Sequence, residues 1–220
     1  MIKAIHLQEV RIGRHALPGE LSIPGDAVGL VVFAHGSGSS RLSPRNRAVA
    51  AALQARRLAT LLYDLLTRSE AEDRRCVFDI ELLASRLEHA LDWAADHPRL
   101  APLATGLFGA STGAAAALVA AALHPLRVAA VVSRGGRPDL AAERLPQVRA
   151  PTLLIVGGAD AEVLELNRTA LERLGCDKRL EIVPGASHLF PEPGSLERVS
   201  TLAGDWFVAH LGAAARAVPR

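Results

Sequence analysis

The run GASTG at residues 109–113 contains a serine, Ser111, in a setting typical of a catalytic nucleophile. The run follows an apolar segment, 105–108, and precedes an alanine-rich helical pattern. A G-x-S-x-G sequence between a strand and a helix indicates a nucleophile elbow, a turn so tight that its flanking residues must be small. We therefore expect Ser111 at the carboxyl edge of a sheet, beside the backbone N–H groups of a helix N-terminus.

A histidine and a carboxylate follow in positions that could activate this serine. Of the eight histidines, only His188 falls in the loop after the last predicted strand, where a side chain can reach back over the sheet edge. The acid should lie between the serine and the histidine, just beyond a strand. Asp160 fits best, although it could instead cap the next helix, and Asp139 is the alternative acid.

A glycine-rich loop at residues 35–40 could supply N–H donors to a tetrahedral oxyanion. One donor is expected from Thr112, the residue after the nucleophile, and the other from Ser37, with Gly36 as the next choice. The Lys-Ser/Thr pair of a phosphate-binding P-loop does not follow these glycines. The predicted chemistry is acyl transfer from an ester through an acyl-enzyme that water hydrolyses.

The elements expected to position these residues alternate between strands and helices. Apolar strands are predicted at about 5–12, 16–23, 29–34, 60–63, 105–108, 129–132, 152–156 and 180–183. Helices are predicted at 45–57, 79–97, 111–124, 160–174 and 195–210, the fourth ending at a C-cap glycine, Gly175. Nearly continuous apolarity is typical of strands buried on both faces. We expect one α/β domain over 1–220, a doubly wound and mostly parallel sheet with its site outside the carboxyl ends of the strands.

Composition excludes several other classes of protein. The 220 residues are 50% hydrophobic, the net charge is +2, and the mean hydropathy is +0.20. Without a block of like charge, neither a nucleic-acid partner nor a membrane partner is expected. Cys76 and Cys176 lack metal or redox spacing. The N-terminus does not read as a signal peptide and no apolar run could span a membrane, so we expect a cytoplasmic monomer or small homo-oligomer.

Taken in order along the chain, these motifs resemble those of the α/β-hydrolase superfamily, and within it the dienelactone-hydrolase-like branch. The resemblance covers nearly the whole chain, at 35–40, 109–113, 157–160 and 185–188. It implies the α/β-hydrolase fold and neither a metal nor an organic cofactor. Dienelactone hydrolases proper carry a cysteine nucleophile, whereas this chain has Ser111. That departure favours a serine esterase.

The chain offers some indications of the substrate, a small-molecule ester. Lidded members of the superfamily insert a cap where this chain has only residues 133–151, so an open site for short acyl groups is expected. Candidate substrate-binding residues are Gly36, Arg41, Tyr63, Leu65, Arg134 and Arg137. Arg41, Arg45 and Arg47, and likewise Arg134 and Arg137, could bind a substrate carboxylate. The alternative is that they pair with Asp64, Glu70 or Asp139.

Other functions remain open at this point. The same catalytic residues would serve a thioesterase, an acyltransferase or a peptidase. A non-catalytic binding module on this fold is a further alternative, because a fold does not by itself imply a function. Tyr63, Leu65 and Leu66 could line an acyl pocket or belong to the core.

Overall fold

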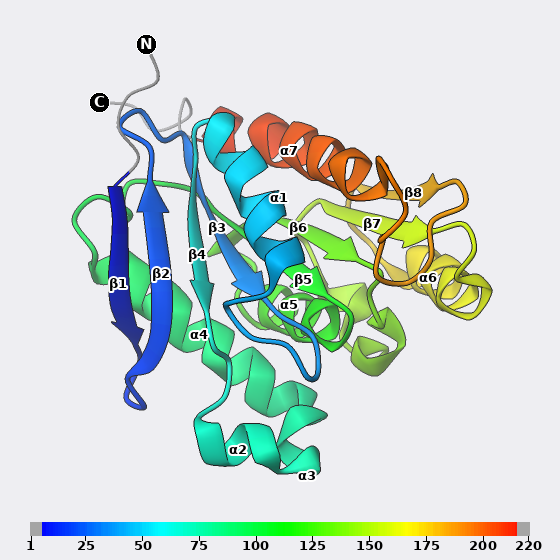
Figure 1. The fold of residues 1–220 in the computed structure, drawn as a ribbon, viewed down its shortest axis with the longest axis horizontal. Helices are drawn as coiled ribbons and strands as arrows, with labels where there is room; N and C mark the ends of the chain where they lie inside the picture. Colours follow the sequence, from blue (N-terminus) through cyan, green and yellow to red (C-terminus); the bar gives the residue numbers. More distant parts are fainter. Residues whose placement is uncertain (1–5, 215–220) are drawn as a thin grey trace.

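An eight-stranded sheet forms the centre of the molecule (Figure 1). The structure, a computed structural model, describes residues 6–214. The strand order is β1-β2-β4-β3-β5-β6-β7-β8, in which β2 is antiparallel to both neighbours and the other pairs are parallel. The strands are β1 (His6–Ile12), β2 (Leu17–Ile23), β3 (Gly29–Ala34), β4 (Leu58–Tyr63), β5 (Thr105–Ala110), β6 (Val128–Arg134), β7 (Thr152–Gly157) and β8 (Lys178–Val183). This arrangement confirms the predicted fold class.

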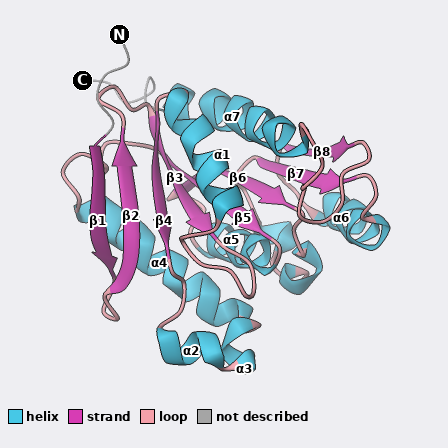
Figure 2. Cartoon of the chain, in the orientation of Figure 1, coloured by secondary structure: helices cyan, strands magenta, loops and turns pink. Residues whose placement is uncertain are grey.

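Helices cover both faces of the sheet and enclose two cores (Figures 1 and 2). The helices are α1 (Pro44–Ala55), α2 (Arg68–Glu72), α3 (Arg74–Val77), α4 (Ile80–Asp96), α5 (Thr112–Leu123), α6 (Ala161–Arg173) and α7 (Ser195–Ala214). One core joins α1 and α7 to the sheet, and the other joins α4, α5 and α6 to the opposite face. The central strands β3, β4 and β7 are buried along their whole length, as continuous apolar runs predict.

Local sequence signals explain where the long helices begin. The Ser43 side chain accepts a hydrogen bond from the Asn46 N–H at the start of α1, and Asp79 accepts one from the Leu82 N–H at the start of α4. Both helices match their predictions to within a few residues. The prediction of a C-cap glycine after α6 is wrong: that helix is capped by Leu174 in an extended conformation, and Gly175 has no positive φ.

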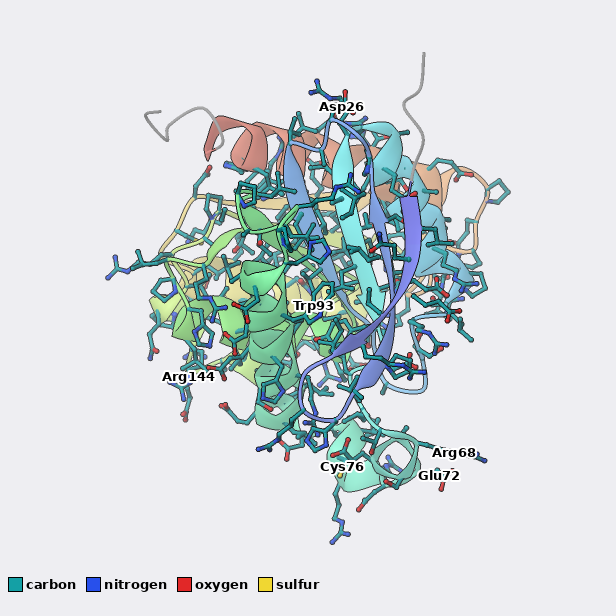
Figure 3. All side chains as sticks on the ribbon, turned by 90° about the vertical axis from the view of Figure 1, so that its left-hand side faces the viewer. Asp26, Arg68, Glu72, Cys76, Trp93 and Arg144 are labelled. Atoms are coloured by element: carbon teal, nitrogen blue, oxygen red, sulfur yellow. The ribbon has the colours of Figure 1, made fainter. Side chains whose placement is uncertain are left out.

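A short helical arm, α2–α3, lies at the carboxyl end of β4 and was not predicted. Its first helix begins with a capping box, in which Thr67 accepts from the Glu70 N–H and Glu70 accepts from the Thr67 N–H. The T-x-x-E motif at 67–70 therefore indicates the start of this helix in the sequence. Figure 3 shows Arg68, Glu72 and Cys76 gathered on this arm at one end of the molecule.

The segment between β6 and β7 carries no cap domain. It contains two short 3-10 helices, η1 (Pro138–Ala141) and η2 (Leu145–Gln147), which pack beside α5. The carboxyl edge of the sheet is therefore left without a lid from this segment, as expected from its length. Over residues 6–214, every helix is too short or too polar to cross a membrane.

Candidate active site

Ser111 occupies a strained turn between β5 and α5. Its φ of 53° and ψ of −123° lie in a region that L-residues with side chains rarely adopt. The motif glycines permit the turn: a Cβ on Gly109 would lie 2.3 Å from the Ala114 Cα, and one on Gly113 would lie 2.2 Å from the Ala34 carbonyl oxygen. The turn has the backbone of the predicted elbow, because no residue larger than glycine fits at 109 or 113.

The end of β6 holds this turn in place. The Ser111 N–H donates to the Arg134 carbonyl at 3.3 Å, and the Arg137 N–H donates to the Ser111 carbonyl at 3.1 Å. A Cβ on Gly135, which lies between Arg134 and Arg137 in the sequence, would be 3.6 Å from Cε1 of His188. The imidazole therefore lies against the same strand end that anchors the serine. Ser111 Oγ and His188 are not hydrogen-bonded to each other in this structure.

His188 and Asp160 form a direct hydrogen bond. His188 Nδ1 donates to Asp160 Oδ2 at 2.7 Å, with the carboxylate largely buried and the imidazole half-exposed. The Asp160 side chain does not cap α6, and its carboxylate instead accepts the hydrogen bond from His188. A proton on Nδ1 leaves Nε2 free to accept one from a nucleophile. The alternative acid, Asp139, is instead held by both Nε and Nη2 of Arg137, at 2.8 and 2.7 Å.

Backbone contacts lock the two loops that carry this pair. The Ala159 N–H donates to the Ala186 carbonyl at 2.9 Å, and the Gly158 N–H donates to the Val183 carbonyl at 2.8 Å. A Cβ on Gly157 would lie 2.2 Å from the Ala186 oxygen, so glycine is required for this approach. The histidine loop is also fastened by Glu192, which accepts from the Ser187 N–H, and hydrogen bonding by Ser187, chiefly through its side chain, lowers the pKa of Glu192.

The two predicted oxyanion donors lie side by side. Thr112 is the first residue of α5, and the Ser37 N–H donates to Thr112 Oγ1 at 2.9 Å. The Ser37 N–H thus already has an acceptor within the protein. Gly36 passes so close to the elbow that a Cβ on it would lie 2.9 Å from the Ser111 Cβ.

His35 anchors this loop to the next strand end, a role that sequence reasoning missed. Its Nε2 accepts from the Leu65 N–H at 3.1 Å, so the ring proton is on Nδ1, which lies 3.1 Å from the Gly36 carbonyl oxygen. Burial lowers the pKa of His35, which keeps the imidazole neutral. The His-Gly pair at the end of an apolar strand was the available signal.

A cavity of about 630 Å³ adjoins the glycine-rich loop at residues 35–40. Its walls include Gly36, Ser37 and the inner side of the α2–α3 arm, at Thr67 and Val77, but neither Ser111 nor His188. Of the predicted pocket residues, Tyr63 and Leu65 are instead fully buried in the core, whereas Leu66 lines this cavity.

The candidate substrate-binding arginines fall into two groups. Arg41 pairs with Asp64 at 2.6 Å, Arg47 pairs with Glu20, and Arg137 pairs with Asp139. Arg41 and Arg137 therefore pair with Asp64 and Asp139, as the alternative to substrate binding predicts. Arg45 and Arg134 form no ion pair with any carboxylate in the described part of the chain. Among residues 6–214 we also find no group of three or more His, Cys, Asp or Glu side chains suited to a metal ion, and both cysteines are free.

This chain is similar to known proteins in sequence and in fold. The dienelactone hydrolase family matches residues 60–217. The crystal structure of a dienelactone hydrolase from Anabaena variabilis is 56% identical, covers 96% of this chain and 100% of that one, and has a TM-score of 0.91. Carboxyl esterase 2 from Tuber melanosporum shares the fold at 17% identity, with 96% of this chain and 88% of that one covered and a TM-score of 0.73.

Two curated relatives from Mycobacterium tuberculosis strains, each named "Putative phosphoribosyl transferase", are 57% identical over 206 residues. The match covers 93% of this chain but 46% of each relative, so the chain spans about half their length. The elbow, the neighbouring His–Asp pair and these similarities agree. The chain belongs to the dienelactone hydrolase family and has the α/β-hydrolase fold.

Proposed function

We propose that this chain is a serine hydrolase that cleaves small carboxylic esters. The observation that carries the proposal is the 2.7 Å hydrogen bond from His188 to Asp160, formed beside a serine held at φ 53°. The strain at Ser111 must be offset by the rest of the fold, so a purely structural role would not favour it. The Asp160 carboxylate does not cap α6, so its hydrogen bond to His188 is not part of a helix cap. The combination matches what nucleophilic catalysis by serine requires.

In this mechanism Ser111 Oγ attacks the ester carbonyl while His188 Nε2 takes its proton. Asp160 holds the imidazole in the required tautomer and stabilises the imidazolium that forms. His188 then returns the proton to the departing alcohol as the C–O bond breaks, leaving an acyl group on Ser111. Water attacks this acyl-enzyme with the same base, and the acid product leaves.

The tetrahedral oxyanion would be stabilised by the backbone N–H groups of Thr112 and Ser37. The Thr112 N–H lies at the N-terminus of α5, where the helix dipole also favours negative charge. The Ser37 N–H would be shared between Thr112 Oγ1 and the oxyanion, or would pass from one to the other. Donors of this kind typically contribute about 10²–10³ in rate each.

The name of the mycobacterial relatives is not carried over to this chain. Less than half of each relative is matched here. The residues assembled at the carboxyl edge are those of a hydrolase, and the esterase named among the structural neighbours is in keeping with that choice. We therefore propose ester hydrolysis, and not phosphoribosyl transfer, for the residues in hand.

The decisive experiment is labelling with a fluorophosphonate probe, which reacts only with an activated serine. We expect wild-type protein to be labelled, and Ser111→Ala and His188→Ala to remain unlabelled. No labelling of folded wild-type protein would leave the binding-module alternative. Product analysis with added thiols, amines and alcohols then separates hydrolysis from acyl transfer, because only a transferase would favour these acceptors over water.

A further inference from the structure

The peptide unit that joins Gly36 to Ser37 is held at both ends by side chains. Its carbonyl oxygen lies 3.1 Å from His35 Nδ1, which carries the ring proton, and its N–H donates to Thr112 Oγ1 at 2.9 Å. His35 is itself fixed by the Leu65 N–H. Because a peptide unit is planar, holding its oxygen also fixes the direction of its N–H. The Ser37 N–H is therefore kept directed at Thr112 Oγ1.

The Thr112 side chain is buried where this loop meets the elbow. Thr112 directly follows Ser111 in the chain and is 3% exposed. A Cβ on Gly36 would lie 2.9 Å from the Ser111 Cβ, and one on Gly113 would lie 2.6 Å from the His35 carbonyl oxygen. The loop therefore packs directly against the start of α5, with the Thr112 hydroxyl at the contact.

The Thr112 hydroxyl still has a proton to donate. A hydroxyl donates one hydrogen bond and accepts others, and this one accepts from Ser37. Within residues 6–214 its own proton has no acceptor, and neither has the Thr112 N–H at the start of α5. Only Cα and Cβ separate the two groups in the covalent structure, so one oxygen atom can accept from both. Two unused donors on a buried residue require an acceptor that the described part of the chain does not supply.

We propose that Thr112 is a further catalytic residue, whose hydroxyl donates a hydrogen bond to the oxyanion beside the N–H of the same residue. This inference rests on the proposed function and deepens it. As Ser111 Oγ bonds to the ester carbon, the carbonyl π electrons move to the oxygen, which accepts from both Thr112 donors. The hydroxyl keeps its proton, and the C=O bond re-forms as the alcohol leaves. While the Ser37 N–H remains on Thr112 Oγ1, it makes that hydroxyl a stronger donor.

The first test removes the hydroxyl but keeps the shape of the side chain. Thr112→Val should lower kcat for p-nitrophenyl acetate by about 10²-fold with little change in KM, because the hydrogen bond strengthens only in the transition state. Thr112→Ser keeps the hydroxyl and should lie much closer to wild type than to Thr112→Val. If Thr112 only filled space, Thr112→Val would be the milder change. An unchanged kcat in Thr112→Val, or a higher one because the hydroxyl had blocked the Ser37 N–H, would overturn the proposal.

A second variant separates donation to the oxyanion from support of the loop. The Ser39 N–H donates to the Gly36 carbonyl at 3.2 Å, and Gly38 has a φ of 67°. These are features of a type II turn, which favours proline at its second position, Ser37. Ser37→Pro therefore removes the N–H and keeps the turn. In that background Thr112→Val should still lower kcat by about tenfold or more. No further loss there would show that Thr112 acts only by holding the loop, which would overturn the proposal.

Thr152→Val is the matched control for the loss of a buried threonine hydroxyl. Thr152 is fully buried at the first position of β7, the end of the strand away from Asp160, and its hydroxyl donates to the Ala150 carbonyl at 2.9 Å. We expect this variant to have a lower Tm and the wild-type kcat. If Thr112→Val fails to fold, Thr112→Ala takes its place with the same expected loss, because it also removes the hydroxyl.

The rate of fluorophosphonate labelling separates this inference from the proposed function. The phosphoryl oxygen of the probe occupies the position of the oxyanion, so Thr112→Val should be labelled to completion but about tenfold or more slowly. Labelling of Thr112→Val at the wild-type rate would overturn the role of the hydroxyl and leave the serine hydrolase proposal intact. Absence of labelling in folded wild-type protein would overturn the proposed function, and this inference with it.

Discussion

At the scale of the residue, Ser111, the proposed nucleophile, has a strained backbone conformation. A side chain at φ 53° and ψ −123° is strained by about 1–3 kcal/mol, and glycine relieves that strain. We predict that Ser111→Ala abolishes hydrolysis of p-nitrophenyl acetate but keeps the fold, because Ala retains the strain without adding bulk. Ser111→Gly should be equally inactive yet more stable than Ser111→Ala by about 1 kcal/mol in urea unfolding. Retained turnover in folded Ser111→Ala would contradict the serine mechanism.

The His188–Asp160 pair leads to a second prediction at this scale. His188→Ala and Asp160→Asn should each reduce kcat by about 10³-fold or more, and the double variant should lose little beyond the worse single one. Residues that act as one unit are not additive. Asp139→Asn is the matched control, since that carboxylate is bound by Arg137. A crippling Asp139→Asn beside a mild Asp160→Asn would reverse the choice of acid.

At the scale of the element, the glycine-rich loop at residues 35–40 is held by a neutral histidine. His35 is buried with a lowered pKa, and its Nε2 accepts from Leu65, so protonation would break a hydrogen bond between two strand ends. In the unfolded chain His35 binds a proton below about pH 6.5, whereas in the folded chain it does so only at a lower pH. Stability contributed by His35 is therefore complete above pH 6.5 and is lost as the pH falls below it.

We predict that wild-type stability falls more steeply below pH 6.5 than that of His35→Asn. The excess slope should approach, at most, about 1.4 kcal/mol per pH unit, the limit for one proton. Urea unfolding between pH 5 and 8 measures it, and the comparison is of slopes, so a uniform loss of stability in the variant does not interfere. Equal slopes would show that His35 does not contribute to the acid sensitivity.

The elements also show how far sequence reasoning reaches. The turn at Ser111 and the loops at Asp160 and His188 could be placed because parallel strands end at one edge, and because glycine at 109, 113 and 157 reports close backbone contacts. The ion pairs of Arg41 and Arg137 could be named only as an alternative, because the sequence does not say which arginines reach a carboxylate. Whether Arg41 meets Asp64 while Arg134 meets no carboxylate depends on which side chains converge from distant elements. The α2–α3 arm was missed although its capping box was legible at Thr67.

At the scale of the whole molecule, the open carboxyl edge should set the range of acyl groups. The β6–β7 segment forms only η1 and η2, and the large cavity lies beside the glycine-rich loop at residues 35–40 instead of over Ser111. Burying a methylene contributes about 0.8 kcal/mol only if it leaves water. We predict that kcat/KM for neutral p-nitrophenyl esters changes little or falls beyond short chains.

The series from acetate to palmitate at concentrations below micelle formation measures this dependence. Extra methylenes on an open edge stay hydrated, so each adds ordering entropy without burial. The cavity behind Gly36 gives the test a second arm: Leu66→Trp, on its wall, should change selectivity only if acyl chains enter it. A steady rise in kcat/KM to palmitate, lost in Leu66→Trp, would show that the cavity is an acyl channel and that the site is not an open cleft for short esters.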